Sequence, residues 1–299
     1  MLKTILPLLA ACAVTLAVDI HSAVSAPKTA AANAVSAPGR AELKGGQLAV
    51  TTGGYRLYFT PKSAWTIREM YFNDKLLLSQ TGAFGSVVSM RESGWAGTGH
   101  GHETVEKIAL QVDGKEYSLD EGLNVSGSRF VLDKQSRFGP YRHFATIELD
   151  GGTIREKFRY EVVEDDSKVN FMYAFMHCMT NTTDRWMAQL SDGSREEGQF
   201  LDDNSFTLKK DIRWAAAYSS SDEIGLVYVY PEVYKGVAKF SNAFWNRPRD
   251  NKLYFRPELP RGVGRKFGYE VTLQAFAAPP AAWEENAGKL IAAIEETTK

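Results

Sequence analysis

The stretch Arg142–Val163, RHFATIELDGGTIREKFRYEVV, decides the fold class. Two runs of alternating apolar and polar residues flank Gly151 and Gly152, which is the pattern of two antiparallel strands joined by a two-residue turn. With this turn Glu148 lies opposite Arg155, and the pairing of opposite charges favours the hairpin. A slip of one residue would move charged side chains onto the apolar face, so the register is well specified.

Short strands and tight turns recur along the rest of the chain. Two-residue turn signals separate pairs of short alternating runs at Gly53-Gly54, Asn73-Asp74 and Asp113-Gly114. The run Val169–Met179 is apolar on both faces and predicts a strand that is buried on both sides. Additional strands are expected at Ser205–Leu208, Ile212–Tyr218, Gly225–Tyr230, Lys252–Phe255 and Phe267–Phe276. Helical spacing of apolar residues from Trp283 to Ile294 adds one C-terminal amphipathic helix, so the predicted fold is all-β, a large β-sandwich of antiparallel sheets.

The N-terminal residues have the organisation of a secretory signal peptide. Lys3 precedes an uncharged, mostly apolar run, Thr4–Val18, and small residues follow. The run is too short to span a bilayer permanently, so we expect an exported protein, periplasmic or extracellular, with no stable membrane span. Cys12 resembles a lipoprotein cysteine, but the apolar run before it is very short and continues beyond it, which argues against lipid anchoring. The expected segments are a signal peptide at 1–25, an Ala/Ser/Pro-rich tether at 26–41 and a single β-sandwich domain at 42–299.

Composition narrows the classes of partner. The 299 residues carry a formal net charge of −1, and no basic cluster suggests a nucleic-acid partner. Cys178 is the one cysteine outside the predicted leader, so the mature chain cannot form an intramolecular disulfide. Because Cys178 lies in an apolar run, we expect a buried, unreactive thiol.

Two segments resemble the galactose-mutarotase-like β-supersandwich superfamily. The stretch Lys168–Thr183, an apolar run that leads into Thr-Asn-Thr-Thr with His177 nearby, is similar to the central strand of that fold. Gly268–Phe276, after a glycine-rich segment, is similar to its closing strand. The resemblance implies sugar binding on a concave sheet face. The chain departs from the epimerases of the superfamily, because His177 precedes the Thr-Asn turn and no C-terminal glutamate base stands out, so simple mutarotase activity is not expected.

His100 and His102 form the first candidate site, because two of only five histidines lie two residues apart here. On an extended backbone both imidazoles would point to the same side. Together with Gly94 and Glu106 they fit the first half of the cupin metal motif, which would make a divalent metal their ligand. They also suit proton transfer at a sugar, since imidazole titrates near neutral pH. The third interpretation is that they only hydrogen-bond a glycine-rich loop.

A second group of candidates surrounds the start of the hairpin. Tyr141, Arg142 and His143 would meet the needs of a uronate lyase, in which Tyr or His moves the proton and Arg neutralises the carboxylate. His143 also shares a face with apolar residues, which favours a core position. His177 ends an apolar strand, where it belongs either to a site or to the core.

Aromatic and polar residues beside loops are the candidate substrate-binding groups. Tryptophan faces suit the C–H faces of sugars, and the candidates are Trp95, Trp186 and Trp245, together with Asn181 and Arg142. The alternating basic stripe Arg155, Lys157 and Arg159 is interpreted either as a solvated face or as a groove for an acidic ligand.

The sequence therefore predicts an exported protein that recognises a carbohydrate ligand. If it is an enzyme, the chemistry is proton transfer on a sugar or uronate, as in a polysaccharide lyase or an epimerase-like enzyme. The alternatives are a non-catalytic carbohydrate-binding module and a cupin-like metalloprotein that uses His100 and His102. No cofactor is expected apart from the divalent metal of that last alternative.

Overall fold

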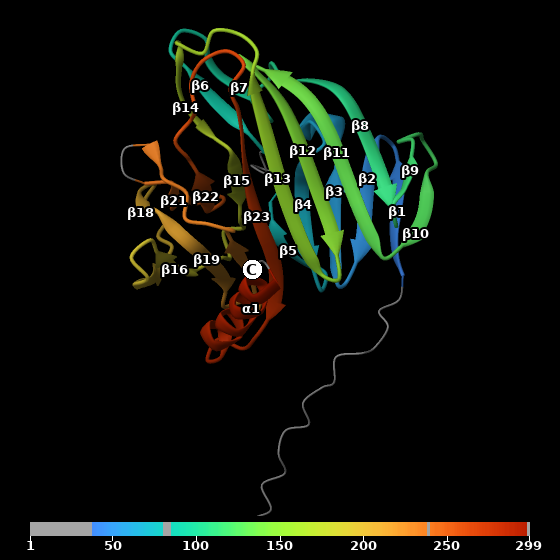
Figure 1. The fold of residues 1–299 in the computed structure, drawn as a ribbon. Helices are drawn as coiled ribbons and strands as arrows, with labels where there is room; N and C mark the ends of the chain where they lie inside the picture. The colour runs from blue at the N-terminus through green and yellow to red at the C-terminus, as the bar shows by residue number, and fades with distance from the viewer. Residues whose placement is uncertain (1–37, 80–84, 238–239, 298–299) are drawn as a thin grey trace, which may run out of the picture. The chain divides into compact units, whose positions relative to one another are not determined.

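Antiparallel strands dominate the computed structural model, which describes residues 38–79, 85–237 and 240–297 (Figure 1). The larger of two main sheets has the order β17-β16-β19-β20-β23-β13-β12-β11-β8-β9. Its strands are β8 (Thr104–Val112), β9 (Lys115–Tyr117), β11 (Arg129–Phe138), β12 (Tyr141–Asp150), β13 (Thr153–Val162), β16 (Arg185–Leu190), β17 (Arg195–Gln199), β19 (Ile212–Ser219), β20 (Ile224–Val229) and β23 (Lys266–Ala277). The predicted all-β class is confirmed.

The other main sheet has six strands in the order β10-β1-β2-β3-β4-β5. They are β1 (Gly39–Lys44), β2 (Gln47–Thr52), β3 (Tyr55–Phe59), β4 (Ile67–Phe72), β5 (Lys75–Leu78) and β10 (Asn124–Gly127), and a short 3-10 helix, η1 (Pro61–Ser63), precedes β4. Because β1 begins at Gly39, the last three residues of the predicted tether belong to this sheet. The predicted signal peptide and most of the tether lie outside the described residues.

Two small sheets complete the sandwich. One has the order β14-β6-β7, with β6 (Val87–Met90), β7 (Gly94–Gly97) and β14 (Val169–Tyr173). The other has the order β15-β22-β21-β18, with β15 (Phe175–Cys178), β18 (Phe206–Lys210), β21 (Asn242–Trp245) and β22 (Lys252–Phe255).

The predicted hairpins are confirmed, and the central one has the predicted register. Glu148 pairs with Arg155 across β12 and β13. Gly151 and Gly152 have φ values of 55° and 88°, a backbone conformation that glycine adopts without a steric cost.

The prediction of one strand from Val169 to Met179, buried on both sides, is wrong. The chain bends at Ala174, so that β14 pairs with β6 whereas β15 pairs with β22. Phe171 and Tyr173 are only partly buried, because the outer face of β14 is not covered by another sheet in the described part of the chain.

The core lies between the sheets, and a second apolar cluster lies beneath the C-terminal helix. Helix α1 (Trp283–Thr297) buries Trp283, Ala287, Ile291 and Ile294 against β19, β20 and β23, as its spacing predicted. Each large apolar side chain buried in this way contributes about 1.5–3 kcal/mol. None of the helices within the described residues is long and apolar enough to cross a membrane.

Candidate functional site

The two histidines of the glycine-rich stretch lie in a turn and not on an extended strand. Residues around His100 form a turn that Gly97 and Gly101 close, and His102 has a φ of 61°. The expectation that both imidazoles point to one side of an extended chain is therefore wrong. Both side chains are exposed, and Glu106 of the cupin-like spacing instead contacts Gln135. Across the described residues, no group of three or more His, Cys, Asp or Glu side chains is arranged to hold a metal ion.

His100 lies at one end of a row of stacked aromatic rings on the outer face of the small sheets. Its ring is 5.8 Å from that of Trp95, and partial desolvation, followed by the charge of Lys252, lowers its pKa. The row crosses five strands, with centroid separations of 4.3–5.8 Å, in the order Trp95, Tyr173, Tyr254, Trp245 and Phe206. The two end rings, Trp95 and Phe206, are each 40% exposed, whereas Tyr254 in the row is buried. Trp95 and His100 are thus neighbours, whereas Tyr173 and Tyr254 lie between Trp95 and Trp245.

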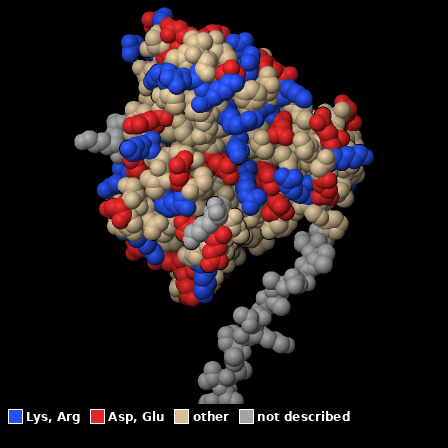
Figure 2. Space-filling view, in the orientation of Figure 1, with Lys and Arg blue, Asp and Glu red and all other residues tan. Residues whose placement is uncertain are grey.

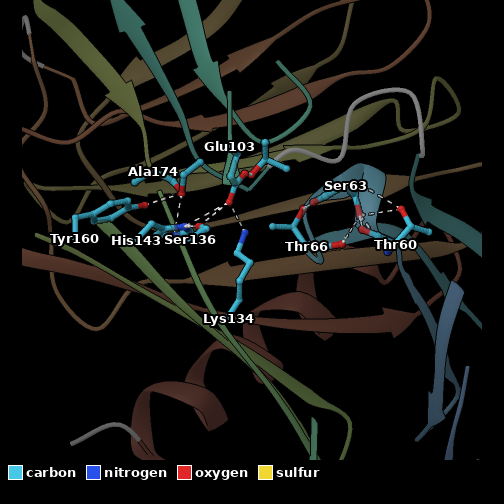
Figure 3. Close-up of polar contacts among 11 residues, drawn as sticks. Thr60, Ser63, Thr66, Glu103, Lys134, Ser136, His143, Tyr160 and Ala174 are labelled. Carbon is cyan, nitrogen blue, oxygen red and sulfur yellow. Dashed lines mark hydrogen bonds and ion pairs between the residues drawn. The ribbon is translucent and has the colours of Figure 1, made fainter. Parts of the chain in front are cut away.

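His143 lies in a buried polar cluster inside the sandwich (Figure 3). Glu103 forms an ion pair of 2.7 Å with Lys134, and both side chains are almost completely buried. The hydroxyl of Ser136 donates to Glu103 at 2.8 Å and lies 3.3 Å from Nδ1 of His143. The imidazole stacks on Tyr160 at 4.9 Å. These contacts give His143 a place in the core, where no substrate can reach it in this conformation.

The cluster fixes the charge of its members. Burial opposes ionisation of Glu103, but the hydrogen bond with His143 and the charge of Lys134 outweigh it and lower the pKa of Glu103 to about 2. Burial lowers the pKa of His143 to about 4, against the opposing effect of Glu103. At neutral pH the cluster therefore contains an ionised Glu103 and a neutral imidazole.

His177 belongs to a separate buried pair. Its Nε2 lies 2.6 Å from a carboxylate oxygen of Glu156, and its Nδ1 has no hydrogen-bond partner within the described structure. The rings of Phe158 and Phe175 lie between His177 and His143. The histidines predicted to share a site are thus divided between two buried pairs and an exposed turn.

The remaining candidates are also dispersed. Tyr141 is completely buried, whereas Arg142 points to the opposite face of β12 and pairs with Glu161 at 3.5 Å. Trp186 is 4% exposed and packs on Phe244, so its ring has no free face for a sugar. Its assignment to substrate binding is wrong for this reason. Asn181 is exposed in the turn after β15, whereas His177, four residues earlier, is buried.

A groove of about 540 Å³ crosses the outer face of β12, β13 and β23. Its floor is a row of three residues in register: Phe144 pairs with Arg159, and Arg159 pairs with Gly268. Tyr234, from the segment after β20, forms part of the wall. Figure 2 shows Lys and Arg side chains in a stripe along β13 on this face. Of the two interpretations of the basic stripe, the groove therefore describes the local shape.

Ion pairs border the floor on both sides. Lys157 lies 3.4 Å from Glu270 in the row below, and Lys266 lies 3.9 Å from Glu161 in the row above. Glu270 neutralises Lys157, whereas Glu161 is shared by Lys266 and Arg142. Arg159 lies between these two rows and has no such ion pair among the described residues.

Arg159 is exposed and has no carboxylate partner among the described residues. Its guanidinium carbon lies 5.4 Å from the centroid of the Phe144 ring. A side chain at Gly268 would place its Cβ 3.2 Å from Cγ of Arg159 and 3.0 Å from the carbonyl oxygen of Phe158. The glycine thus leaves room for the arginine side chain, whose planar fork matches a carboxylate.

The wall adds an uncharged hydrogen-bonding group. Burial raises the pKa of Tyr234 to about 12, against a hydrogen bond to the backbone of Glu270. The phenol is therefore protonated over the physiological range. The groove combines the Arg159 guanidinium, two aromatic side chains and a neutral hydroxyl, and no histidine is among its described lining residues.

Sequence reasoning missed the buried ions, although a signal was present. Alternation along β11 places Lys134 and Ser136 on the same face as Phe130 and Leu132, which predicts two polar groups inside the core. Gly268, the third residue of β23, was a second signal, because glycine inside a strand often marks a close approach. Glu156 had the same kind of signal, since the alternation along β13 places it on the same face as Ile154 and Phe158.

Comparisons with known proteins concern the fold alone. No family model matches the chain, and none of the curated proteins compared with it matches. Among solved structures, a TPR-domain containing protein from Parabacteroides distasonis is 12% identical over 78% of this chain and 47% of its own, with a TM-score of 0.43. A galactose mutarotase-like protein from Clostridium acetobutylicum is 11% identical over 78% and 95%, with a TM-score of 0.42. An α-N-acetylgalactosaminidase from Bifidobacterium bifidum is 8% identical over 81% and 38%, with a TM-score of 0.49.

These matches include the superfamily that the sequence resembles. This chain spans less than half of the TPR-domain protein and of the acetylgalactosaminidase. At these identities and TM-scores the similarities carry no argument about function. What the chain does has to be argued from its own groove.

Proposed function

We propose that the protein binds an acidic carbohydrate, with a uronate residue held in the groove over β12, β13 and β23. The observation that carries this proposal is the guanidinium of Arg159, which is exposed and without a carboxylate partner among the described residues. A uronate carboxylate accepts two parallel hydrogen bonds from such a fork. The rings of Phe144 and Tyr234 supply apolar surface for the C–H groups of the same sugar.

Binding without catalysis is favoured over proton-transfer chemistry. General acid–base catalysis requires an acid or base within hydrogen-bond reach of the substrate. The histidines are outside the groove, and the two glutamates that line it, Glu161 and Glu270, are paired with lysines. The proposed role is therefore that of a carbohydrate-binding module. We also propose that it acts outside the cytoplasm, which follows from the predicted signal peptide.

The proposal is tested by calorimetry with oligogalacturonate and with a neutral oligogalactoside as the comparison ligand. Arg159→Gln removes the free cation, and Arg155→Gln is the matched control, because Arg155 lies on the same face of the same strand but pairs with Glu148 at 3.4 Å. A charge-assisted hydrogen bond contributes about 1.5–3 kcal/mol, so Arg159→Gln should weaken uronate binding roughly 10- to 100-fold. The control should bind within about twofold of wild type.

Two results would overturn the proposal. One is equal affinity for the acidic and neutral oligosaccharides, which would leave no role for the cation. The other is an equal loss in both arginine variants, which would indicate a general effect of surface charge.

A further inference from the structure

A second basic cavity, separate from the groove, lies where two loops meet at one end of the molecule. It has a volume of about 720 Å³ and is lined by Arg91, Arg256 and Arg261, with Asp166 as the one acidic side chain. The segment before β14 and the segment after β22 come together here, at the top of Figure 1, because the backbone N–H of Gly262 donates to Asp166 at 3.2 Å. Three guanidinium groups thus face a cavity that contains one carboxylate.

Arg261 is held in place by the protein itself. Its guanidinium donates to the backbone carbonyl of Asp166 at 3.1 Å and lies 3.9 Å from the Asp166 carboxylate. The charge of Asp166 is therefore shared with this arginine. It does not neutralise the other two.

Arg256 has unusual surroundings for a cation. Its guanidinium carbon lies 3.9 Å from the centroid of the Phe171 ring and 5.6 Å from that of Phe240. Its Nε is buried without a hydrogen-bond partner, and the described residues give it no ion pair. A partly desolvated charge of this kind is costly unless an anion compensates it. The two rings hold the fork in one orientation, which reduces the entropy lost when a ligand binds.

Arg91, in the turn between β6 and β7, is the third arginine of the cavity. It follows β6 directly, and its backbone N–H donates to the carbonyl of Lys168, which fixes the turn against the start of β14. Its side chain is exposed and has no ion pair in the described structure. Lys168 beside it is already paired with Glu92 at 2.6 Å, so the surplus of positive charge comes from the arginines.

We propose that this cavity binds a tetrahedral oxyanion group, a sulfate ester or a phosphate monoester, between Arg91, Arg256 and Arg261. Either ester offers three terminal oxygen acceptors, with one negative charge in a sulfate ester and up to about two in a phosphate monoester. Three acceptors match Arg91 and Arg256, which have no ion pair among the described residues, and Arg261, which Asp166 orients. A carboxylate offers only two oxygens and is the poorer match. The site is independent of the uronate groove and of the function proposed for it.

The experiment is a calorimetric titration of the full chain with inorganic sulfate and inorganic phosphate at constant ionic strength, with acetate as the carboxylate comparison. Saturable binding of a tetrahedral anion at about millimolar affinity or tighter is expected, with acetate at least about tenfold weaker. Glucose 6-sulfate and glucose 6-phosphate then distinguish the two kinds of ester. Preference for either ester supports the site and identifies its source.

Arg256→Gln should weaken anion binding about tenfold or more. The matched control is Arg247→Gln, because Arg247 also stacks on an aromatic ring, at 4.7 Å from Trp245, but is paired with Asp250 at 3.5 Å. The control should bind within about twofold of wild type. If Arg256→Gln does not fold, Arg91→Gln, at an exposed position, carries the same test.

The inference would be overturned by the absence of saturable binding of sulfate and phosphate, by acetate binding as tight as either, or by equal affinity in Arg256→Gln and wild type. Arg159→Gln serves as the link to the groove: it should leave sulfate and phosphate binding unchanged. A loss of anion binding in that variant would place the anion in the groove and not in this cavity.

Discussion

The substitution Lys134→Met should destabilise the protein strongly, although Lys134 lines neither of the proposed binding sites. It removes the cation that lies 2.7 Å from Glu103 and leaves a carboxylate that is only 3% exposed inside the sandwich. The pKa of Glu103 falls from 4.5 to about 2 in the folded protein, and 1.36 kcal/mol per unit of pKa gives about 3 kcal/mol of stabilisation at neutral pH, to which His143 and Lys134 both contribute. Loss of one partner of a buried pair typically costs about 3–5 kcal/mol, which agrees with this magnitude.

Urea unfolding at pH 7, followed by tryptophan fluorescence, measures the effect. The double variant Lys134→Met/Glu103→Gln removes both charges, so it should be more stable than Lys134→Met alone. The contribution of Glu103 is present above pH 4.5 and disappears as the pH falls toward about 2, because the depressed pKa lies in the folded state. A loss below about 1 kcal/mol in Lys134→Met, or a double variant that loses the sum of both single effects, would refute the reasoning.

Three more changes have defined outcomes. Burial lowers the pKa of His143 from 6.5 to about 4, so the unfolding free energy of the wild type should fall as the pH drops from 6.5 to 4. His143→Phe should lose up to about 3 kcal/mol less over this range. Parallel curves of urea-derived unfolding free energy against pH would contradict this. Gly268→Val should displace the side chain of Arg159, because the new Cβ would lie 3.2 Å from its Cγ. The variant should bind oligogalacturonate at least about tenfold more weakly. An unchanged affinity by calorimetry would show that the groove floor tolerates a side chain at this position. Burial raises the pKa of Cys178 to about 12, so its thiol should react with an aromatic disulfide reagent only in denaturant, and rapid labelling of the native protein would show that β15 opens.

The fold was predictable because its signals are local. Two-residue turns and strict alternation specified the hairpins, and the pairing of Glu148 with Arg155 followed from one turn assignment. The strand through Ala174 was predicted wrongly, since the change of partner from β6 to β22 depends on contacts with segments far away in the sequence. Apolar composition alone does not show where one sheet ends and the next begins.

The candidate site was harder to predict, because sequence reasoning gave most weight to rare residues. Histidines are conspicuous in this chain, but His143 and His177 complete buried polar pairs. Arg159 is one of many cations, and what distinguishes it is the absence of a partner on the neighbouring strands within the described structure. That property depends on the register of three strands and on Gly268 opposite Arg159. The residue pattern of a single strand does not contain this information.

The most direct test of the proposed function is a crystal structure of the protein with a bound oligogalacturonate. The account predicts a sugar in the groove over β12, β13 and β23, with its carboxylate within hydrogen-bond distance of the Arg159 guanidinium and its ring against Phe144 or Tyr234. A sugar bound instead along the aromatic row at Trp95 and Trp245, with the groove empty, would contradict it.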